Sequence, residues 1–171
     1  MYLRYTGILC LMATGMSMGQ VIPDPGAHAP QVTQTNTGVP VVNVTAPNPA
    51  GVSLNHYQHL NVNPMGLIFN NATTAVHTQL GSALPANPLL TGSSASVIVN
   101  QVTHPNPSQL LGPMEVAGQK AHLIIANPAG ITCDGCGFLN ATQGTLTTGT
   151  PVLSGNGSLD HFRVEQGTLS I

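Results

Sequence analysis

Two of the three cysteines stand in a Cys-x-x-Cys arrangement, Cys133-Asp134-Gly135-Cys136, a spacing that occurs in disulfides and in metal sites. The Asp-Gly turn between them can bring the two Cα atoms within disulfide range, so a disulfide between Cys133 and Cys136 is our first interpretation. Zinc is the alternative, with His56 and His59 completing a Cys2His2 set. A thioredoxin-type redox site is not expected, because no βαβ pattern surrounds the two cysteines.

Acid–base or nucleophilic catalysis needs a grouped set of reactive side chains, and the sequence offers none. The chain has only five Asp and Glu residues, and no two of them are paired within a motif. It also contains no Gly-x-Ser-x-Gly, phosphate-binding loop or His-Glu-x-x-His sequence. We therefore predict a protein that is not an enzyme and that uses no cofactor or metal.

Charged residues are scarce, with 3 Lys and Arg and 5 Asp and Glu among 171 residues and a net charge of −2. So few basic groups cannot neutralise a phosphate backbone, and nucleic-acid binding is not expected. A hydrophobic content of 42% is too high for a disordered chain, while 19 Gly and 14 Pro indicate many turns. No apolar run reaches the roughly 18 residues of a membrane-spanning helix, so no integral membrane span is expected.

Residues 1–19 are typical of a secretory signal peptide. Arg4 supplies the positive start, Ile8–Met12 lies in the apolar stretch, and Ser17-Met18-Gly19 is a small-x-small cleavage site. The sequence therefore predicts export through the inner membrane and cleavage before Gln20. Export places the cysteines in an oxidising environment.

Beyond the signal peptide, short β-branched segments alternate with Asn-Pro, Gly and Asn-Gly turns, which predicts strands and almost no helix. The apolar segments lie at 39–44, 60–62, 67–69, 96–102, 114–116, 122–126, 138–139, 145–148, 162–164 and 168–171. The stretch 67–80 lacks Gly and Pro but shows no sustained helical stripe, and we expect it to be mostly irregular.

A repeat links the C-terminal segments. Residues 143–147, Gln-Gly-Thr-Leu-Thr, recur as Gln-Gly-Thr-Leu-Ser at 166–170, an offset of 23 residues. Apolar residues recur at two positions of this 23-residue period. One position is occupied by Val116, Leu139 and Phe162, and the other by Leu123, Leu146 and Leu169. We therefore predict a parallel β-helix in which each coil stacks on the last. The alternative is a β-sandwich, for which Asp134-Gly135 and Asn156-Gly157 would supply hairpin turns.

A solenoid exposes a strand edge at each end, and such an edge promotes aggregation unless it is covered. We expect residues 20–38 to form an extended arm or cap segment, residues 39–113 a capping region, and residues 114–171 the first coils of the β-helix. The strand pattern is still running at Ile171, so we expect the chain to be the front, or a fragment, of a longer protein.

Several segments of the sequence resemble a known family, the N-terminal two-partner secretion domain of filamentous haemagglutinins, haemolysins and adhesins. The similar segments, which agree in order and spacing, are His122–Ile131, Pro40–Val44, Gly51–Asn55 and Phe69–Asn71. The resemblance implies a right-handed parallel β-helix with an N-terminal cap. It also implies recognition in the periplasm by the periplasmic domains of a partner outer-membrane transporter, and nucleation of folding at the cell surface. The protein would then be secreted or associated with the surface of a Gram-negative cell.

Two family motifs can be placed on this sequence, and the resemblance assigns them to transporter recognition or to shaping the cap. The first is Asn127-Pro128-Ala129-Gly130-Ile131, with Ala129 in place of an expected Asn, and the second is Asn87-Pro88-Leu89-Leu90, with Leu89 in place of an Asn. Pro at the second turn position and Gly at the fourth suit a chain reversal after a strand.

The resemblance bears on two further points. A Cys-x-x-Cys pair is typical of the haemolysin-like branch, which favours that branch for this chain. The alternative function is an adhesin module that binds a host glycan or host-cell protein directly, but few aromatic or charged side chains are available for such a surface.

Overall fold

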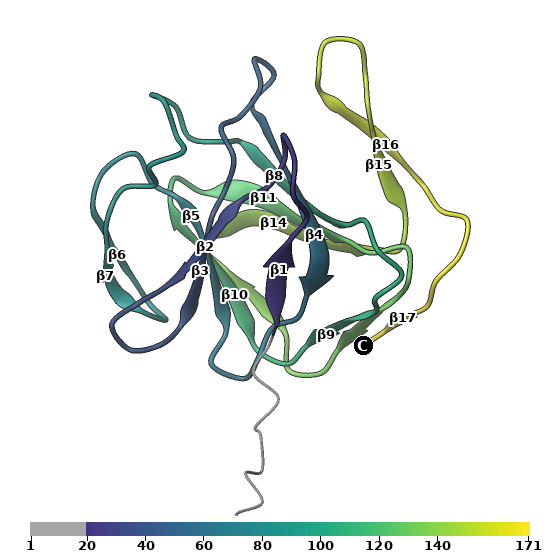
Figure 1. Ribbon diagram of the computed structural model, residues 1–171, viewed down its shortest axis with the longest axis horizontal. Coiled ribbons are helices and arrows are strands. Elements are labelled where there is room, and N and C mark those ends of the chain that lie inside the picture. The colour runs from purple at the N-terminus through teal and green to yellow at the C-terminus, as the bar shows by residue number, and fades with distance from the viewer. Residues whose placement is uncertain (1–19) are drawn as a thin grey trace, which may run out of the picture.

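The structure is a computed structural model, and it describes residues 20–171. The predicted signal peptide, residues 1–19, lies outside the described residues. Within residues 20–171 the chain forms 17 strands and no helix (Figure 1). No segment in this range is therefore a helix that could span a membrane.

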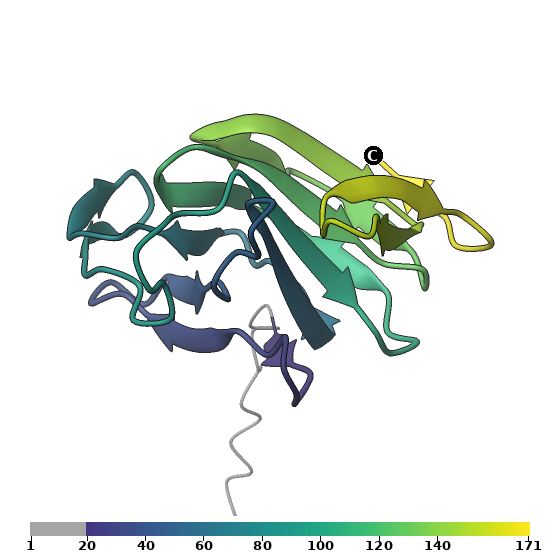
Figure 2. The ribbon, with the colours of Figure 1, turned by 90° about the horizontal axis from the view of Figure 1, so that it is seen from above.

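The chain winds through three sheets in a fixed order, and each turn after the first adds one strand to each sheet (Figures 1 and 2). The first coil comprises β3 (Pro40–Asn43), β4 (Val52–Leu60) and the bridge residue Val62. The second comprises β5 (Leu67–Asn71), β8 (Val97–Val102) and β9 (Ser108–Leu110). The third comprises β10 (Pro113–Gly118), β11 (Ala121–Ala126) and β12 (Ile131–Cys133). The fourth comprises β13 (Gly137–Leu139), β14 (Ala141–Thr147) and β17 (Leu169–Ser170).

Equivalent strands of successive coils pair in parallel, as the sequence predicted for a β-helix. With β1 (Val21–Pro23) and β2 (Gln31–Gln34) included, sheet A has the order β1-β4-β8-β11-β14, sheet B the order β13-β10-β5-β3-β2, and sheet C the order β17-β12-β9. The inward side chains stack in register: Val42 lies beside Phe69, and Phe69 beside Val116, all fully buried in one core. Each coil therefore covers the apolar layer of the coil before it.

The arm formed by residues 20–38 covers the N-terminal edges of two sheets. Its strand β1 (Val21–Pro23) pairs antiparallel with β4 in sheet A, and its strand β2 (Gln31–Gln34) pairs antiparallel with β3 in sheet B. The first parallel coil is thus not left with bare strand edges on these two sheets.

Two hairpins leave the solenoid and cover the outer faces of its sheets. The hairpin β6 (Val76–Thr78)–β7 (Ser82–Leu84) lies over sheet B, where Leu84 packs with Val41 and Ile68. The hairpin β15 (Thr150–Leu153)–β16 (Leu159–Arg163) lies over sheet A, where its apolar side chains pack on Val52, Val99 and Ile124. The central strands of sheets A and B are therefore mostly buried on both faces, which explains continuous apolar runs such as Leu123–Ala126.

The 23-residue repeat is wrong in its register, although the fold that it suggested is confirmed. Leu139 pairs with Glu115 and not with Val116, and Leu146 pairs with Ile125 and not with Leu123. The third cycle is not a stacked coil of the same kind. Phe162 belongs to the antiparallel hairpin, and Leu169 lies in sheet C beside Ile131. The hairpin inserts residues between β14 and β17, so no constant period can run through them.

The expectation of a mostly irregular stretch at 67–80 is also wrong. Residues 67–71 form β5, which is buried along its whole length, and residues 76–78 form β6. The sequence predicted a strand segment only at 67–69, because the two adjacent amides at Asn70 and Asn71 concealed the rest of β5. In the fold both are buried and hydrogen-bonded, so they do not interrupt it.

Candidate functional site

Asn127 directly follows strand β11 and closes a tight turn with its side-chain oxygen and its backbone oxygen. Its Oδ1 accepts a hydrogen bond from the Ala129 N–H at 2.9 Å, and its backbone oxygen accepts one from the Gly130 N–H at 3.0 Å. Its Nδ2 donates to the backbone oxygen of Asn106 and to Oγ of Ser108, each at 2.8 Å. The side chain is fully buried, so it connects the third coil to the second from inside.

Asn87 repeats this geometry in the second coil. Its Oδ1 accepts from the Leu89 N–H at 2.8 Å, and its Nδ2 donates to the backbone oxygens of Val44 and Asn70, each at 2.8 Å. The Leu90 N–H completes the turn by bonding to the Asn87 backbone oxygen at 3.2 Å. Both motif asparagines thus fix a corner of the chain and join it to neighbouring segments.

The two departures from the family motifs leave the turns intact. The side chains at 89 and 129 supply no part of the turn, because the asparagine oxygen bonds to the backbone N–H of those residues. Gly130 has a φ of +119°, and a Cβ there would lie 3.3 Å from the Thr168 backbone oxygen, so the position favours glycine. Ile131 lies in the main core.

Two further turns of the same kind were missed in the sequence. At Asn48-Pro49-Ala50-Gly51, the Asn48 Oδ1 accepts from the Ala50 N–H, and its Nδ2 donates to the Gly157 backbone oxygen at 2.8 Å. At Asn63-Pro64-Met65-Gly66, the Asn63 Oδ1 accepts from the Met65 N–H at 2.9 Å. The recurring Asn-Pro-x-Gly sequence was the signal that could have revealed both.

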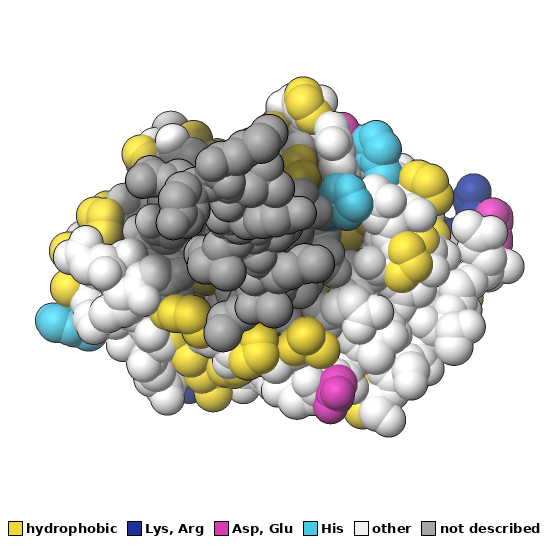
Figure 3. Space-filling view, turned by 60° about the horizontal axis from the view of Figure 1, so that its bottom comes forward, with side chains coloured by type: hydrophobic (Ala, Val, Ile, Leu, Met, Phe, Trp, Pro, Cys, Tyr) yellow, Lys and Arg dark blue, Asp and Glu magenta, His cyan; other side chains and the backbone are white. Residues whose placement is uncertain are grey.

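The motif prolines, unlike the asparagines, lie at the surface beside shallow hollows. Pro88 lines a hollow of about 370 Å³ next to strand β2, and Pro128 and Ala129 line one of about 220 Å³ next to Thr103 and His104. No Lys, Arg, Asp or Glu lines either hollow. Figure 3 shows one face of the molecule, on which few Lys, Arg, Asp or Glu side chains are visible among the described residues. Any contact made at these motifs is therefore dominated by apolar and uncharged polar groups.

Buried amides connect the coils elsewhere. The Asn70 Nδ2 donates to Asn43 Oδ1 at 2.9 Å, and the Asn71 Nδ2 bonds to the backbone oxygens of Ala95 and Gln119. Tyr57 donates to Asn100 Oδ1 at 2.8 Å, and complete burial raises the pKa of its phenol well above 10, which keeps it a neutral donor. Within the described residues no buried side-chain polar atom lacks a partner.

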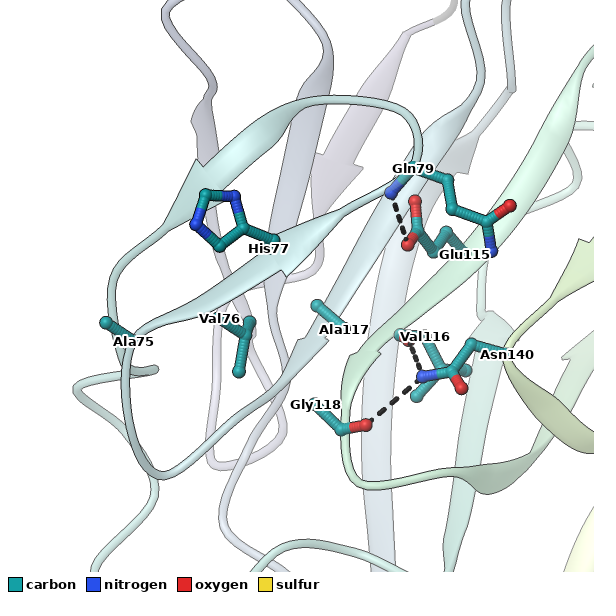
Figure 4. A pocket seen from close by; sticks show the side chains of 9 residues that line it. All are labelled: Ala75, Val76, His77, Gln79, Glu115, Val116, Ala117, Gly118 and Asn140. Atoms are coloured by element: carbon teal, nitrogen blue, oxygen red, sulfur yellow. Dashed lines mark hydrogen bonds between the residues drawn. The ribbon is translucent and has the colours of Figure 1, made fainter.

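Glu115 is a buried acid whose role is structural in this geometry. Its carboxylate accepts hydrogen bonds from the backbone N–H groups of Gln79 (2.8 Å) and Leu80 (2.9 Å), which fastens the β6–β7 hairpin to β10. Figure 4 shows the cavity beside it, where the Asn140 Nδ2 donates to the backbone oxygens of Val116 and Gly118. The Asn140 amide covers the part of the β10 edge that β13 does not reach.

Cys133 and Cys136 lie on either side of a turn, with their Cα atoms 5.3 Å apart and their sulfur atoms within bonding distance. His56 and His59 lie on β4 and do not join them. Between residues 20 and 171 no three His, Cys, Asp or Glu side chains gather in an arrangement that could hold a metal ion. The Cys2His2 alternative is therefore wrong.

Comparison with known proteins agrees with this architecture. The family model described as "TPS secretion domain", for two-partner secretion, matches residues 19–171. The chain belongs to the TPS secretion domain family. TPS secretion domains are secretion modules of proteins that are secreted or surface-associated in Gram-negative bacteria, and they imply an outer-membrane transporter as partner.

A solved structure shares the fold of this TPS domain. The filamentous hemagglutinin secretion domain superposes with a TM-score of 0.80 at 44% identity, over 87% of this chain and 48% of that one. The resemblance stated from the motifs is thereby confirmed, and so is the β-helix fold.

Among curated relatives, this TPS domain is 46% identical over 165 residues to a "tRNA nuclease CdiA" of Yersinia mollaretii, a match that covers 96% of this chain and 5% of that protein. It is 44% identical over 148 residues to a "Hemolysin" of Proteus mirabilis, covering 86% of this chain and 9% of that protein. The chain thus spans a small part of these relatives, and the nuclease and hemolysin names describe those whole proteins.

Proposed function

We propose that this TPS domain is recognised in the periplasm by the periplasmic domains of its partner transporter, and that it nucleates β-helix folding at the cell surface. The main support is the solenoid itself: β1 and β2 cover the N-terminal edges of sheets A and B, and each later coil stacks on a completed layer. A stack built in this way grows in one direction. An almost uncharged chain also crosses a narrow pore with little cost of charge desolvation.

Folding outside the cell would favour outward movement of the chain. Each coil that stacks removes apolar surface from water, at roughly 25 cal/mol per Å². The in-register layer Val42–Phe69–Val116 is the kind of contact that forms at each step. Because β4, β8 and β11 pair in sequence order, a coil has a template as soon as the previous coil is complete.

Within the two motifs we assign different roles to different residues. The asparagines Asn87 and Asn127 hold the two turns from inside. Gly130 permits the chain reversal in the second motif. The last residues of the motifs, Leu90 and Ile131, pack on the core. The groups available for a transporter are the exposed or half-exposed side chains of the turn tips. These are Pro88 and Leu89 in the first motif and Pro128 and Ala129 in the second.

We also propose that Cys133 and Cys136 form a disulfide in the exported protein. The support is their geometry, with the Cα atoms 5.3 Å apart across the Asp-Gly turn, together with the oxidising environment that export implies. The bond would hold the end of strand β12 against the start of β13.

Binding of the mature chain, residues 20–171, to the purified periplasmic domains of the transporter tests recognition. We expect binding by the unchanged chain, and weaker binding when Pro88→Asp or Pro128→Asp places a charge at the turn tips. The matched control is Pro64→Asp, in the exposed tip of the equivalent turn at Asn63. Absence of binding by the unchanged chain, both when kept unfolded and when folded, would refute the proposal. Equal binding by all three variants would show that the two motifs are not part of the surface that contacts the transporter.

A further inference from the structure

The β15–β16 hairpin belongs to the fourth coil but covers the first three. It leaves the stack after β14, and the chain returns to the stack at β17 (Figure 1). Three apolar side chains of the hairpin are half-buried against sheet A: Leu153, Leu159 and Phe162. The buried residues beneath them come from the first, second and third coils: Val52, Val99 and Ile124. One hairpin therefore contacts three successive coils.

The surface beneath the hairpin exists only when the coils are stacked. Leu54, Val99 and Ile124 lie side by side in the register of sheet A, one in each of the first three coils. The fourth coil has Thr145 at this position. Among residues 20–171, the hairpin is the only segment outside sheet A that contributes to this apolar cluster. Without the hairpin, the row of apolar side chains would face water.

The tip of the hairpin reaches back to the first coil. The Asn48 Nδ2 donates to the Gly157 backbone oxygen at 2.8 Å, although the two residues are 109 positions apart in the sequence. Gly157 has a φ of +85°, and a Cβ there would lie 2.6 Å from the Asn48 Nδ2, so this close approach requires glycine. The bond aligns the tip, while the apolar side chains provide the contact with sheet A.

A hairpin of this size depends on the surface that it covers. Strands β15 and β16 have four and five residues, and an isolated two-stranded hairpin is at best marginally stable in water. Because the apolar row takes one residue from each of three coils, it is complete only after those coils have stacked. The hairpin therefore docks after the coils, and it must be lifted before they separate.

We infer that residues 150–163 form a clasp, which closes after the coils have stacked and slows the unfolding of the finished β-helix. Contacts that form after the transition state for folding change the unfolding rate and leave the folding rate almost unaltered. The use of the clasp in export rests on the proposed function: a domain that unfolds slowly at the cell surface does not return to the extended form that the pore admits.

The rates of unfolding and refolding of the mature chain, residues 20–171, test the clasp. They are measured by circular dichroism after rapid changes in urea concentration. The double variant Leu153→Ala, Phe162→Ala removes two of the three apolar side chains that face sheet A. Its unfolding should be at least about tenfold faster, and its refolding rate should change by less than about twofold.

Two control variants separate the clasp contacts from other changes in the hairpin. Thr150 and Arg163 are exposed and face each other across the same two strands, so the double variant Thr150→Ala, Arg163→Ala should keep both rates within about twofold. Asn48→Asp loosens only the tip and should also keep both rates within about twofold.

A variant in the stacked core gives the opposite signature. Val116→Ala removes a fully buried side chain from the layer between coils. Because the coils stack before the clasp closes, refolding of this variant should be at least about fivefold slower.

The inference is wrong if the folded clasp variant unfolds no faster than the unchanged chain, or if its refolding is slowed as much as in Val116→Ala. Phe162→Leu keeps an apolar side chain and should unfold about threefold faster, which provides the same test should the double variant not fold. All rates are measured without the transporter. Absence of binding to the periplasmic domains would therefore refute the proposed function and leave the clasp standing, and a failed clasp would leave that binding unaffected.

Discussion

At the residue scale, the asparagines of the Asn-Pro turns have the largest expected effect. Asn127→Ala removes hydrogen bonds to Asn106, Ser108 and Ala129 from a fully buried site. Because the groups left behind cannot reach water, the free energy of unfolding should fall by about 2–3 kcal/mol. Urea denaturation measures this loss. Asn36→Ala, at an exposed turn, should change stability by less than about 0.5 kcal/mol, and equal effects of the two changes would contradict the account.

Histidine protonation should destabilise the fold in mild acid. Burial lowers the pKa of His56, the neighbouring His28 lowers it further, and Asp24 partly opposes the shift. Burial also lowers the pKa of His122. The unfolded chain, with a histidine pKa near 6.5, then binds more protons than the folded one as the pH falls through that value. The stability that the neutral rings contribute is complete above that pH and is lost below it.

Urea midpoints at pH 8 and pH 5 test this dependence. We expect a lower midpoint at pH 5 and a smaller difference between the two pH values in His56→Gln. His161→Gln, which changes an exposed histidine on the hairpin, serves as the control. A midpoint that rises at pH 5, or a difference that His56→Gln leaves unchanged, would show that the half-buried His56 ring is not responsible.

Replacing Cys133 and Cys136 by Ser should have only a modest effect on folding. The two residues are close in sequence, so the loop that a disulfide closes is very small, and its entropic contribution is at most about 2 kcal/mol. Thermal unfolding of the double variant, compared with the unchanged oxidised chain, measures the difference. Complete loss of the fold would mean that the pair does more than close a turn.

The sequence allowed the position of the motif residues to be predicted but not their roles. The motifs carry Leu89 and Ala129 where an asparagine is expected, and the sequence does not show that the turns use only the backbone N–H of these residues. The partners of Asn127 Nδ2 belong to the preceding coil. Such contacts depend on coil stacking, which residue types alone do not specify.

At the element scale, the β15–β16 hairpin is fastened to the first coil by one side-chain bond at its tip. The Asn48 Nδ2 donates to the Gly157 backbone oxygen, while the Asn48 Oδ1 holds its own turn. Asn48→Asp keeps the turn acceptor and loses the donor. Amide exchange in residues 150–163 should therefore become faster, with β4, β8 and β11 unchanged. Faster exchange throughout the β-helix, or no change in the hairpin, would contradict this.

Strand prediction succeeded where a strand is apolar on both faces and failed where polar side chains are inserted. Segments 96–102 and 122–126 were placed almost as β8 and β11 form. Only the last residue of β4 fell in a predicted segment, because Ser53, Asn55 and the histidines break its apolar pattern. Ser53 and Asn55 point inward and are satisfied there by other polar groups, which a count of apolar residues cannot reveal.

At the scale of the whole molecule, stacking of successive coils explains why the fold was predictable although its register was not. The prediction of a β-helix rested on the recurrence of similar short strands and on the resemblance to two-partner secretion domains, and neither requires a constant spacing. The spacing itself changes wherever a hairpin leaves the stack, as β15–β16 does between β14 and β17. The first copy of the Gln-Gly-Thr-Leu sequence therefore lies within β14 of sheet A, whereas only Leu169 of the second copy reaches a strand, β17 of sheet C.

Export of this chain by its transporter tests the central claim most directly. The chain, with residues 1–19 in place, is produced in Gram-negative cells with and without the cognate transporter, and its amounts in the periplasm and in the medium are measured. We predict that folded, protease-resistant protein reaches the medium only when the transporter is present. Equal amounts in the medium without the transporter, or retention in the periplasm with it, would contradict the account.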